Sequence, residues 1–160
     1  MFTPWLLKKK LVSLFLFCLG TCIQAQEPEE AFDRGFDAFE AKNYQVAAEL
    51  WQKAAQEGHV RAQNGLGVLY RDGLGVDQNP EKAISWFYMS ADNGYAFGMD
   101  NLASFYIDQG GAREMEVEAY KWLFIATAIN FDERANYKLY ILSTKLERSE
   151  IRQAQDEAQS

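Results

Sequence analysis

The stretch from His59 to Gly94 reads HVRAQNGLGVLYRDGLGVDQNPEKAISWFYMSADNG and carries the signals of a complete helix-turn-helix unit. The apolar stripe of its first helix stops at Gly73-Leu74-Gly75. These glycines predict the end of that helix, because glycine readily adopts the positive φ angles found where a helix ends. A second helix is predicted to begin at Asn79-Pro80-Glu81, with the asparagine capping free amides and the proline needing no amide partner. Asn93-Gly94 then marks the end of that helix.

The same signals recur with a period of 36 residues on both sides of this stretch. Four pairs of residues share this offset: Gly58 and Gly94, Leu66 and Leu102, Tyr70 and Tyr106, and Trp86 and Trp122. A fixed period of this length is typical of repeat proteins in which each unit packs on its neighbours. The sequence therefore predicts an all-α fold, an α/α superhelical solenoid of helix-turn-helix repeats.

The repeat fills the chain after its N-terminal segment. We expect one solenoid domain over residues 26–160, with a short acidic lead, units near 31–58, 59–94 and 95–130, and a terminal capping pair over 131–158. In the terminal pair the pattern slips by one residue. Asn43 is predicted to cap the second helix of the first unit. Asn130 is predicted to end the second helix of the third unit in the left-handed conformation.

One face of each helix repeats small and apolar residues and is predicted to be buried. On the first helices this stripe comprises Ala62, Leu66, Leu69 and Tyr70, then Gly98, Leu102, Phe105 and Tyr106, then Ala135, Leu139 and Leu142. On the second helices it comprises Ala47, Leu50, Ala54 and Ala55, then Ala83, Trp86, Ser90 and Ala91, then Ala119, Trp122, Ala126 and Thr127. Small residues let helices approach closely, and Trp86 and Trp122 are expected to fill the gaps beside them.

Residues 1–25 are predicted to be a secretory signal peptide. Lys8 to Lys10 precede an apolar run, Leu11 to Ile23, that is short for a membrane span. A cut after Ala25 would leave a 135-residue periplasmic or secreted protein without a membrane-inserted segment. Leu19-Gly20-Thr21-Cys22 loosely resembles a lipobox, so a lipid anchor at Cys22 is one alternative and an uncleaved anchor another.

Removal of the signal would change both the cysteine content and the charge. Cys18 and Cys22 lie in that segment, so apolar packing must hold the helices without disulfides. The whole chain has 16 basic and 23 acidic residues, and loss of three lysines leaves 13 against 23, a net charge of −10. This surface repels nucleic acid and anionic headgroups and favours a basic protein partner. The alternative is that the acidity serves only solubility.

The chain resembles the Sel-one-like repeat (SLR) family, a relative of the tetratricopeptide repeats. Ala62 to Tyr70 with Gly73-Leu74-Gly75-Val76 is similar to that family's first helix and glycine turn, and Lys82 to Phe87 and Glu118 to Trp122 to its second helix. The resemblance covers about Ala31 to Ala158. It implies first helices that line a concave face, and a role as an adaptor, as in periplasmic regulators of sensor kinases. The third unit departs from the family pattern in two ways. Its turn does not read G-x-G-V, and its last helix lacks a Ser or Thr cap.

The sequence offers no set of residues for chemistry. His59 is the only histidine, and a metal site or a Ser-His relay needs further groups in reach. It is interpreted as structural or solvent-facing. Gly65-Leu66-Gly67 follows no strand and is interpreted as packing glycine rather than a phosphate cradle. We therefore expect no enzyme activity, no catalytic residue, no metal and no cofactor.

A partner is expected to bind residues of the first helices that lie opposite the buried stripe. The candidate partner-binding residues are Asn64, Val68, Arg71, Asp100, Ser104, Ile107, Tyr137 and Ile141. Four of them, Val68, Ile107, Tyr137 and Ile141, are apolar where the fold is not expected to need an apolar residue. The alternative is that they are isolated exposed apolar residues, which are common on protein surfaces.

Three classes of function follow. The first is a non-enzymatic periplasmic adaptor or regulator that binds a protein partner on the concave face. The second is an immunity or inhibitor protein that neutralises a toxin in the periplasm. The third is a small hydrolase-like or ligand-binding enzyme, a function suggested by disulfide-rich relatives of the family and not by the residues of this chain.

Overall fold

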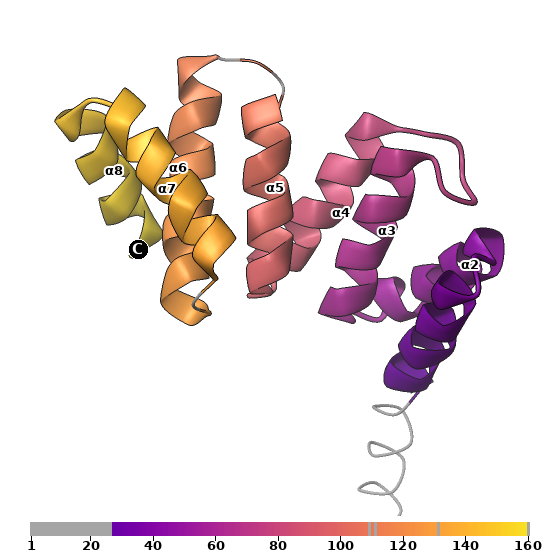
Figure 1. Ribbon diagram of the computed structural model, residues 1–160. Helices are drawn as coiled ribbons and strands as arrows, with labels where there is room; N and C mark the ends of the chain where they lie inside the picture. Colours follow the sequence, from indigo (N-terminus) through magenta and orange to yellow (C-terminus); the bar gives the residue numbers. More distant parts are fainter. Residues whose placement is uncertain (1–26, 109, 111, 131, 160) are drawn as a thin grey trace, which may run out of the picture.

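The computed structural model describes residues 27–108, 110, 112–130 and 132–159, which form helices joined by short turns (Figure 1). A helix over residues 27–40 is followed by α2 (Tyr44–Gln56), α3 (Val60–Asp72), α4 (Pro80–Asp92), α5 (Ala96–Asp108), α6 (Arg113–Ile129), α7 (Glu133–Lys145) and α8 (Arg148–Ala158). No strand occurs in these residues. The predicted all-α helix-turn-helix solenoid is confirmed.

Successive helices stack side by side along the array, from the indigo end to the yellow end of Figure 1. From α2 to α6, each helix packs on the next one in the chain, and α3 also touches α5. At the C-terminal end, α7 and α8 both pack on α6. The predicted signal peptide, residues 1–25, and the proposed lipid anchor at Cys22 lie outside the described residues. Within the described part, no helix is long and apolar enough to cross a membrane.

The turn between α3 and α4 follows the sequence prediction closely. Gly73 has a φ of 68° and Gly75 a φ of 70°, so both lie in the left-handed region. A Cβ on Gly75 would overlap the backbone of Tyr44, which shows how closely the first unit approaches this turn. The side chain of Asn79 accepts a hydrogen bond from the amide of Lys82 over 2.8 Å, and Pro80 begins α4. These contacts confirm the predicted ends of both helices.

Three helix ends differ from the sequence predictions. Residues 27–30, expected to be an acidic lead, are helical. Asn43 precedes α2, but its side chain makes no capping hydrogen bond. Asn130 has a φ of −142° and a ψ of 123°, which is extended rather than left-handed. When α4 is shifted by the 36-residue period, α6 ends one residue later than α4 does. Asp132 then caps α7.

The buried stripe of the first helices is confirmed. Ala62, Leu66 and Leu69 of α3, Leu102 of α5, and Ala135 and Leu142 of α7 are all at most 2% exposed. The aromatic members of the stripe, Tyr70, Phe105 and Tyr106, are only half-buried, as is Leu139.

The large residues that fill the second helices were predicted one position too early. Trp51, Phe87 and Leu123 are the buried ones, with exposures of 4%, 0% and 0%. Leu50, Trp86 and Trp122 are only half-buried, and the two tryptophans pack at the edge of the core. The reason is helical geometry, because Trp51 shares one face with the fully buried Ala47, Ala54 and Ala55 at spacings of four, three and four residues.

Glycines of the first helices make room for these buried rings. A Cβ on Gly35 or Gly65 would overlap the Trp51 indole, so this ring packs between two glycine backbones. A Cβ on Gly67 would overlap the ring of Phe87 in the same way. The Trp51 Nε1 donates a hydrogen bond to the carbonyl oxygen of Phe32 over 3.1 Å, which satisfies its polar atom inside the core.

Candidate functional site: the first-helix face

We call the surface formed by helix 27–40, α3, α5 and α7 the first-helix face. It carries all eight residues predicted to bind a partner, and hydrogen bonds join three of its helices. Asn101 Nδ2 donates to Asn64 Oδ1 over 2.8 Å, linking α5 to α3. Lys138 Nζ of α7 donates to Asp100 Oδ1 and to Ser104 Oγ of α5, each over 2.7 Å. We name this set of contacts the polar ladder.

Two of the apolar candidates are used by the fold, contrary to expectation. Val68 packs against the cluster that contains Phe87 and Leu102, and Ile107 packs against the cluster that contains Leu123. In a solenoid each first helix is covered by its own unit and by the neighbouring units, so the covered arc is wider than one stripe. The assumption that these two positions are not needed by the core is wrong, and their role in binding stays a prediction.

The remaining candidates differ in how accessible they are. Tyr137 is 65% exposed, and Tyr140 next to it on α7 is 63% exposed, whereas Ile141 is half-buried. Arg71 is exposed but donates from Nε and Nη2 to the carboxylate of Asp72, over 2.7 and 2.8 Å. These hydrogen bonds hold the pKa of Asp72 below its ordinary value and raise the pKa of Arg71. Tyr137 is thus the most accessible candidate on this face.

A groove of about 250 Å³ lies between helix 27–40 and α3. Two predicted residues, Asn64 and Val68, line it, together with residues that the sequence reasoning did not select: Phe32, Phe36, Phe39, Trp51, Arg61, Gly65 and Tyr95. Phe32, Phe36 and Phe39 recur at spacings of four and three residues on one helix, and this pattern could have revealed the groove. Phe36 is 47% exposed, so its ring is open to a partner.

His59 lies beside Phe32 and has a structural role, as expected. Its Nδ1 accepts a hydrogen bond from the amide of Ala62 over 3.2 Å and so caps α3. Because Nδ1 accepts, the neutral ring carries its proton on Nε2, which lies 2.9 Å from Glu29 Oε2. The imidazole also stacks on Phe32, with ring centroids 4.7 Å apart. These contacts fasten helix 27–40 to the start of α3.

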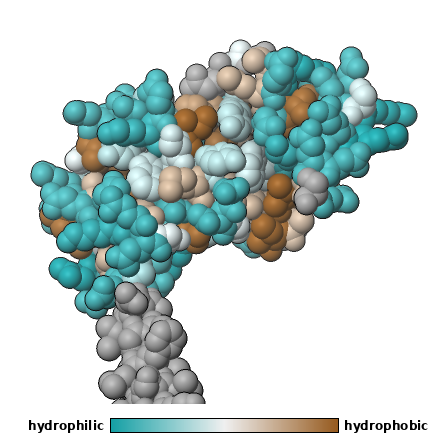
Figure 2. Space-filling view, turned by 180° about the vertical axis from the view of Figure 1, so that it is seen from behind, coloured by the Kyte–Doolittle hydropathy of each residue, from teal (hydrophilic) through white to brown (hydrophobic). Residues whose placement is uncertain are grey.

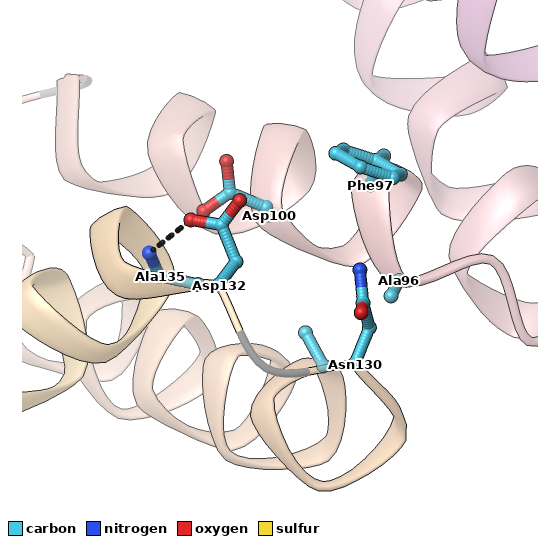
Figure 3. A pocket seen from close by; sticks show the side chains of 7 residues that line it. Ala96, Phe97, Asp100, Asn130, Asp132 and Ala135 are labelled. Carbon is cyan, nitrogen blue, oxygen red and sulfur yellow. Dashed lines mark hydrogen bonds between the residues drawn. The ribbon is translucent and has the colours of Figure 1, made fainter.

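A second, smaller pocket lies between the start of α5, the end of α6 and the start of α7 (Figure 3). Two carboxylates line it, Asp100 and Asp132, and both are occupied by bonds within the protein. Asp132 Oδ1 accepts hydrogen bonds from the amides of Arg134 and Ala135, which lower the pKa of the carboxyl group, and Asp100 binds Lys138. The pocket volume, about 10 Å³, holds roughly one water molecule.

The described residues offer little for catalysis. They contain no group of three His, Cys, Asp or Glu side chains that could hold a metal ion. A general acid at neutral pH needs a raised carboxyl pKa. The carboxyl shifts resolved for described residues go the other way, because hydrogen bonds lower the pKa values of Asp72, Asp132 and Glu150.

The side of the molecule seen in Figure 2 carries its hydrophobic surface as separate patches among hydrophilic residues. Large continuous apolar patches mark protein–protein or membrane interaction sites. The patches on this side are smaller and separate. Exposed apolar residues outside the first-helix face include Val46 on α2 and Met89 on α4. They belong to different second helices and serve below as matched controls.

The comparisons with known proteins agree with this geometry. The family model of the Sel1 repeat matches residues 30–59 and 60–95. The chain carries two Sel1 repeats. A sel1-like repeat-containing protein of Acanthamoeba polyphaga mimivirus is 33% identical over 58 residues, which cover 36% of this chain and 11% of the viral protein.

Two solved structures have the same architecture as this Sel1-repeat protein. The first is c5321, a protective antigen of uropathogenic Escherichia coli strains with an SLR fold, at a TM-score of 0.77 and 23% identity over 86% of this chain and 30% of that one. The second is a Sel1 repeat protein from Oxalobacter formigenes, at a TM-score of 0.65 and 25% identity over 84% of this chain and 56% of that one. The chain thus spans only part of the length of each of these proteins.

Proposed function

We propose that this Sel1-repeat protein acts outside the cytoplasm as a non-enzymatic adaptor or regulator, and that it binds a protein partner on the concave side lined by its first helices. Sel1 repeats are generally protein-interaction modules. The observation that carries the proposal is the first-helix face, where the polar ladder joins α3, α5 and α7 while Tyr137 remains 65% exposed. A preorganised surface with exposed aromatic anchors is what a binding module needs.

The test changes Tyr137 and Ile141 together to lysine and measures capture of partners from the envelope fraction by quantitative mass spectrometry. Because a few anchors dominate an interface, capture should fall by about tenfold or more while helical content is unchanged. The matched control changes Val46 and Met89, exposed apolar residues of second helices, to lysine. Equal loss in both double variants would show that the first-helix face is not the binding surface.

His59→Ala separates binding from folding. The histidine caps α3 and contacts helix 27–40, so the variant should lower the melting temperature. At a temperature where the variant is still folded, its capture of the partner should be nearly unchanged. If capture needed His59 and ignored Tyr137 and Ile141, the adaptor proposal would give way to a histidine-centred site.

Export is tested on the native protein by mass spectrometry. The proposal expects a soluble periplasmic chain that begins at Gln26, whereas a diacylated N-terminal Cys22 would make it a membrane-anchored one. The net charge of −10 expected after signal removal favours a basic partner, and a basic toxin is the alternative form of such a partner. A toxin gene beside this one, and recovery of that toxin in the capture experiment, would favour the immunity function over the adaptor.

A further inference from the structure

We propose that the groove between helix 27–40 and α3 receives a protein segment with an apolar anchor side chain flanked by lysine or arginine. The inference rests on the proposed function, since it assumes that the first-helix face binds a protein. It adds a place on that face and the chemistry of the segment bound there.

The shape and lining of the groove suit one apolar anchor. Phe36 is 47% exposed, and it stacks on the buried Phe32 with ring centroids 6.4 Å apart, so its ring is held in place before a partner arrives. Val68 and Tyr95 also line the groove. Its volume of about 250 Å³ is below the roughly 300–1,000 Å³ of pockets that enclose a small molecule. An inserted side chain of a larger partner is the better fit.

The charge beside the groove selects a cationic segment. Residues 27–40 contain six acidic residues and one basic one, Arg34. Asp33 and Glu40 stand three residues before and four residues after Phe36, so they lie next to it on the helix surface. Both are exposed, and neither forms an ion pair with another described residue. A lysine or arginine beside the anchor would meet these two carboxylates.

Among the described residues that line the groove there is one arginine, Arg61, and it is paired with an acidic side chain. The Arg61 guanidinium lies 4.2 Å from the centre of the Phe32 ring, and its Nη1 is 3.6 Å from Glu29 Oε1. Burial raises the pKa of Tyr95, and the nearby Arg61 guanidinium partly offsets this rise. Arg61 therefore rigidifies the wall of the groove, and the unpaired charge beside Phe36 is negative.

The test measures binding of a fluorescent probe peptide by anisotropy, using the purified protein. The probe has a central tryptophan flanked by lysines, and its comparison peptides replace either the lysines by glutamate or the tryptophan by serine. The proposal expects saturable binding of the first peptide alone. Binding should weaken as salt is raised, because exposed charges are screened. Absence of saturable binding by the first peptide, or equal binding of the glutamate peptide, would overturn the proposal.

Variants of the protein locate the site. Phe36→Ser should weaken probe binding by about tenfold, as expected for an anchor contact. Asp33→Asn with Glu40→Gln should weaken it by roughly fivefold, as expected for two exposed charge pairs. The matched control, Glu133→Gln with Asp156→Asn, removes the same charge from the C-terminal part and should leave binding unchanged. If both double variants weakened probe binding equally, the probe would be attracted by the net charge of the protein rather than by this groove.

The outcomes separate this inference from the proposed function. If partner capture depends on Tyr137 and Ile141 but the probe does not bind, the face is a binding surface and the groove assignment is wrong. If the probe binds at the groove but changing Tyr137 and Ile141 leaves partner capture unchanged, the groove assignment is supported. The proposal that the wider first-helix face binds the partner is then wrong. A dimer in sedimentation that Phe36→Ser dissociates, with no probe binding, would assign the groove to a second copy of this chain and overturn the proposal.

Discussion

The second unit, α3 with α4, and the terminal pair, α7 with α8, are held in the solenoid by different forces. Four residues of α4 are buried, among them Phe87 with no exposed surface, and α3 buries five residues. By contrast, α7 buries only Ala135 and Leu142, and α8 buries only Ala154. The interior unit depends on apolar packing, whereas the terminal pair buries few residues of its own.

Polar contacts compensate at the terminal pair. Arg113 of α6 donates from Nε and Nη2 to the two carboxylate oxygens of Glu150 on α8, over 2.9 and 2.8 Å. Gln155 of α8 donates to the Tyr120 hydroxyl oxygen over 3.1 Å. Lys138 binds α7 to α5 through the polar ladder. Since exposed ion pairs weaken with salt and with protonation, the two regions should respond differently to the same change of conditions.

The largest effect is expected for Phe87→Ala. The ring is fully buried against Gly67, so its removal should lower the free energy of unfolding by about 3–5 kcal/mol. Trp86→Ala, at the neighbouring half-buried position, should cost clearly less, although the sequence predicted that Trp86 fills the gap beside the small residues. Urea unfolding measures both. Equal losses at the two positions would contradict the packing of α4.

A smaller effect is expected for Gly67→Ala. The added Cβ would overlap the Phe87 ring, and overpacking of this kind costs about 1–3 kcal/mol. Phe87→Leu in the same chain should recover part of the loss, because the shorter side chain leaves room for the methyl group. A double variant as unstable as the sum of the two single variants would show that they do not share a contact.

The smallest effect is expected at the terminal pair and depends on pH. The hydrogen bond from Arg113 holds the pKa of Glu150 below its ordinary value. A lowered folded-state pKa stabilises the fold above the unfolded value, about 4.3, and this contribution disappears as the pH falls through the folded value. Hydrogen exchange of α8 amides, compared with α3 amides, should therefore show α8 opening first as the pH drops below about 4.

Glu150→Gln is the control for this pH dependence. It removes the titrating group, so the difference between α8 and α3 should become less dependent on pH in that range. An unchanged pH profile in the variant would assign the effect to another carboxylate, such as Asp132, whose pKa is also lowered by its hydrogen bonds.

Local sequence signals predicted the helix ends of the second unit because each depends on one or two residues. Asn79 with Pro80, and Gly73 with Gly75, have the same role in any context. The identity of the buried ring was harder to predict. Trp86 and Phe87 each belong to a series with the same 36-residue period, so periodicity could not decide between them. The helical spacing within α4 decides it, because Phe87 shares one face with the buried Ala83, Ser90 and Ala91.

The candidate site was predicted in part, and the limits have a physical cause. Asn64, Asp100 and Ser104 were selected as facing away from the core, and they do so, but their partners Asn101 and Lys138 lie in the next unit. Such contacts follow from the stacking of units, which a single helix does not encode. The groove between helix 27–40 and α3 was not predicted, because the candidate residues all lie on α3, α5 and α7. Most of the aromatic lining of the groove comes from helix 27–40.

The glycine beside Phe87 has a consequence for how such an array can evolve. In the second unit a glycine, Gly67, accompanies a phenyl ring, whereas 36 residues later Ala103 and Leu123 are buried in one cluster. A larger residue on one helix is balanced by a smaller one on the other. Exchanging α4 for α6 would press the phenyl ring against a methyl group in one unit and leave a void in the other. The repeats share a backbone but are not interchangeable modules, so the packing of the array depends on their order along the chain.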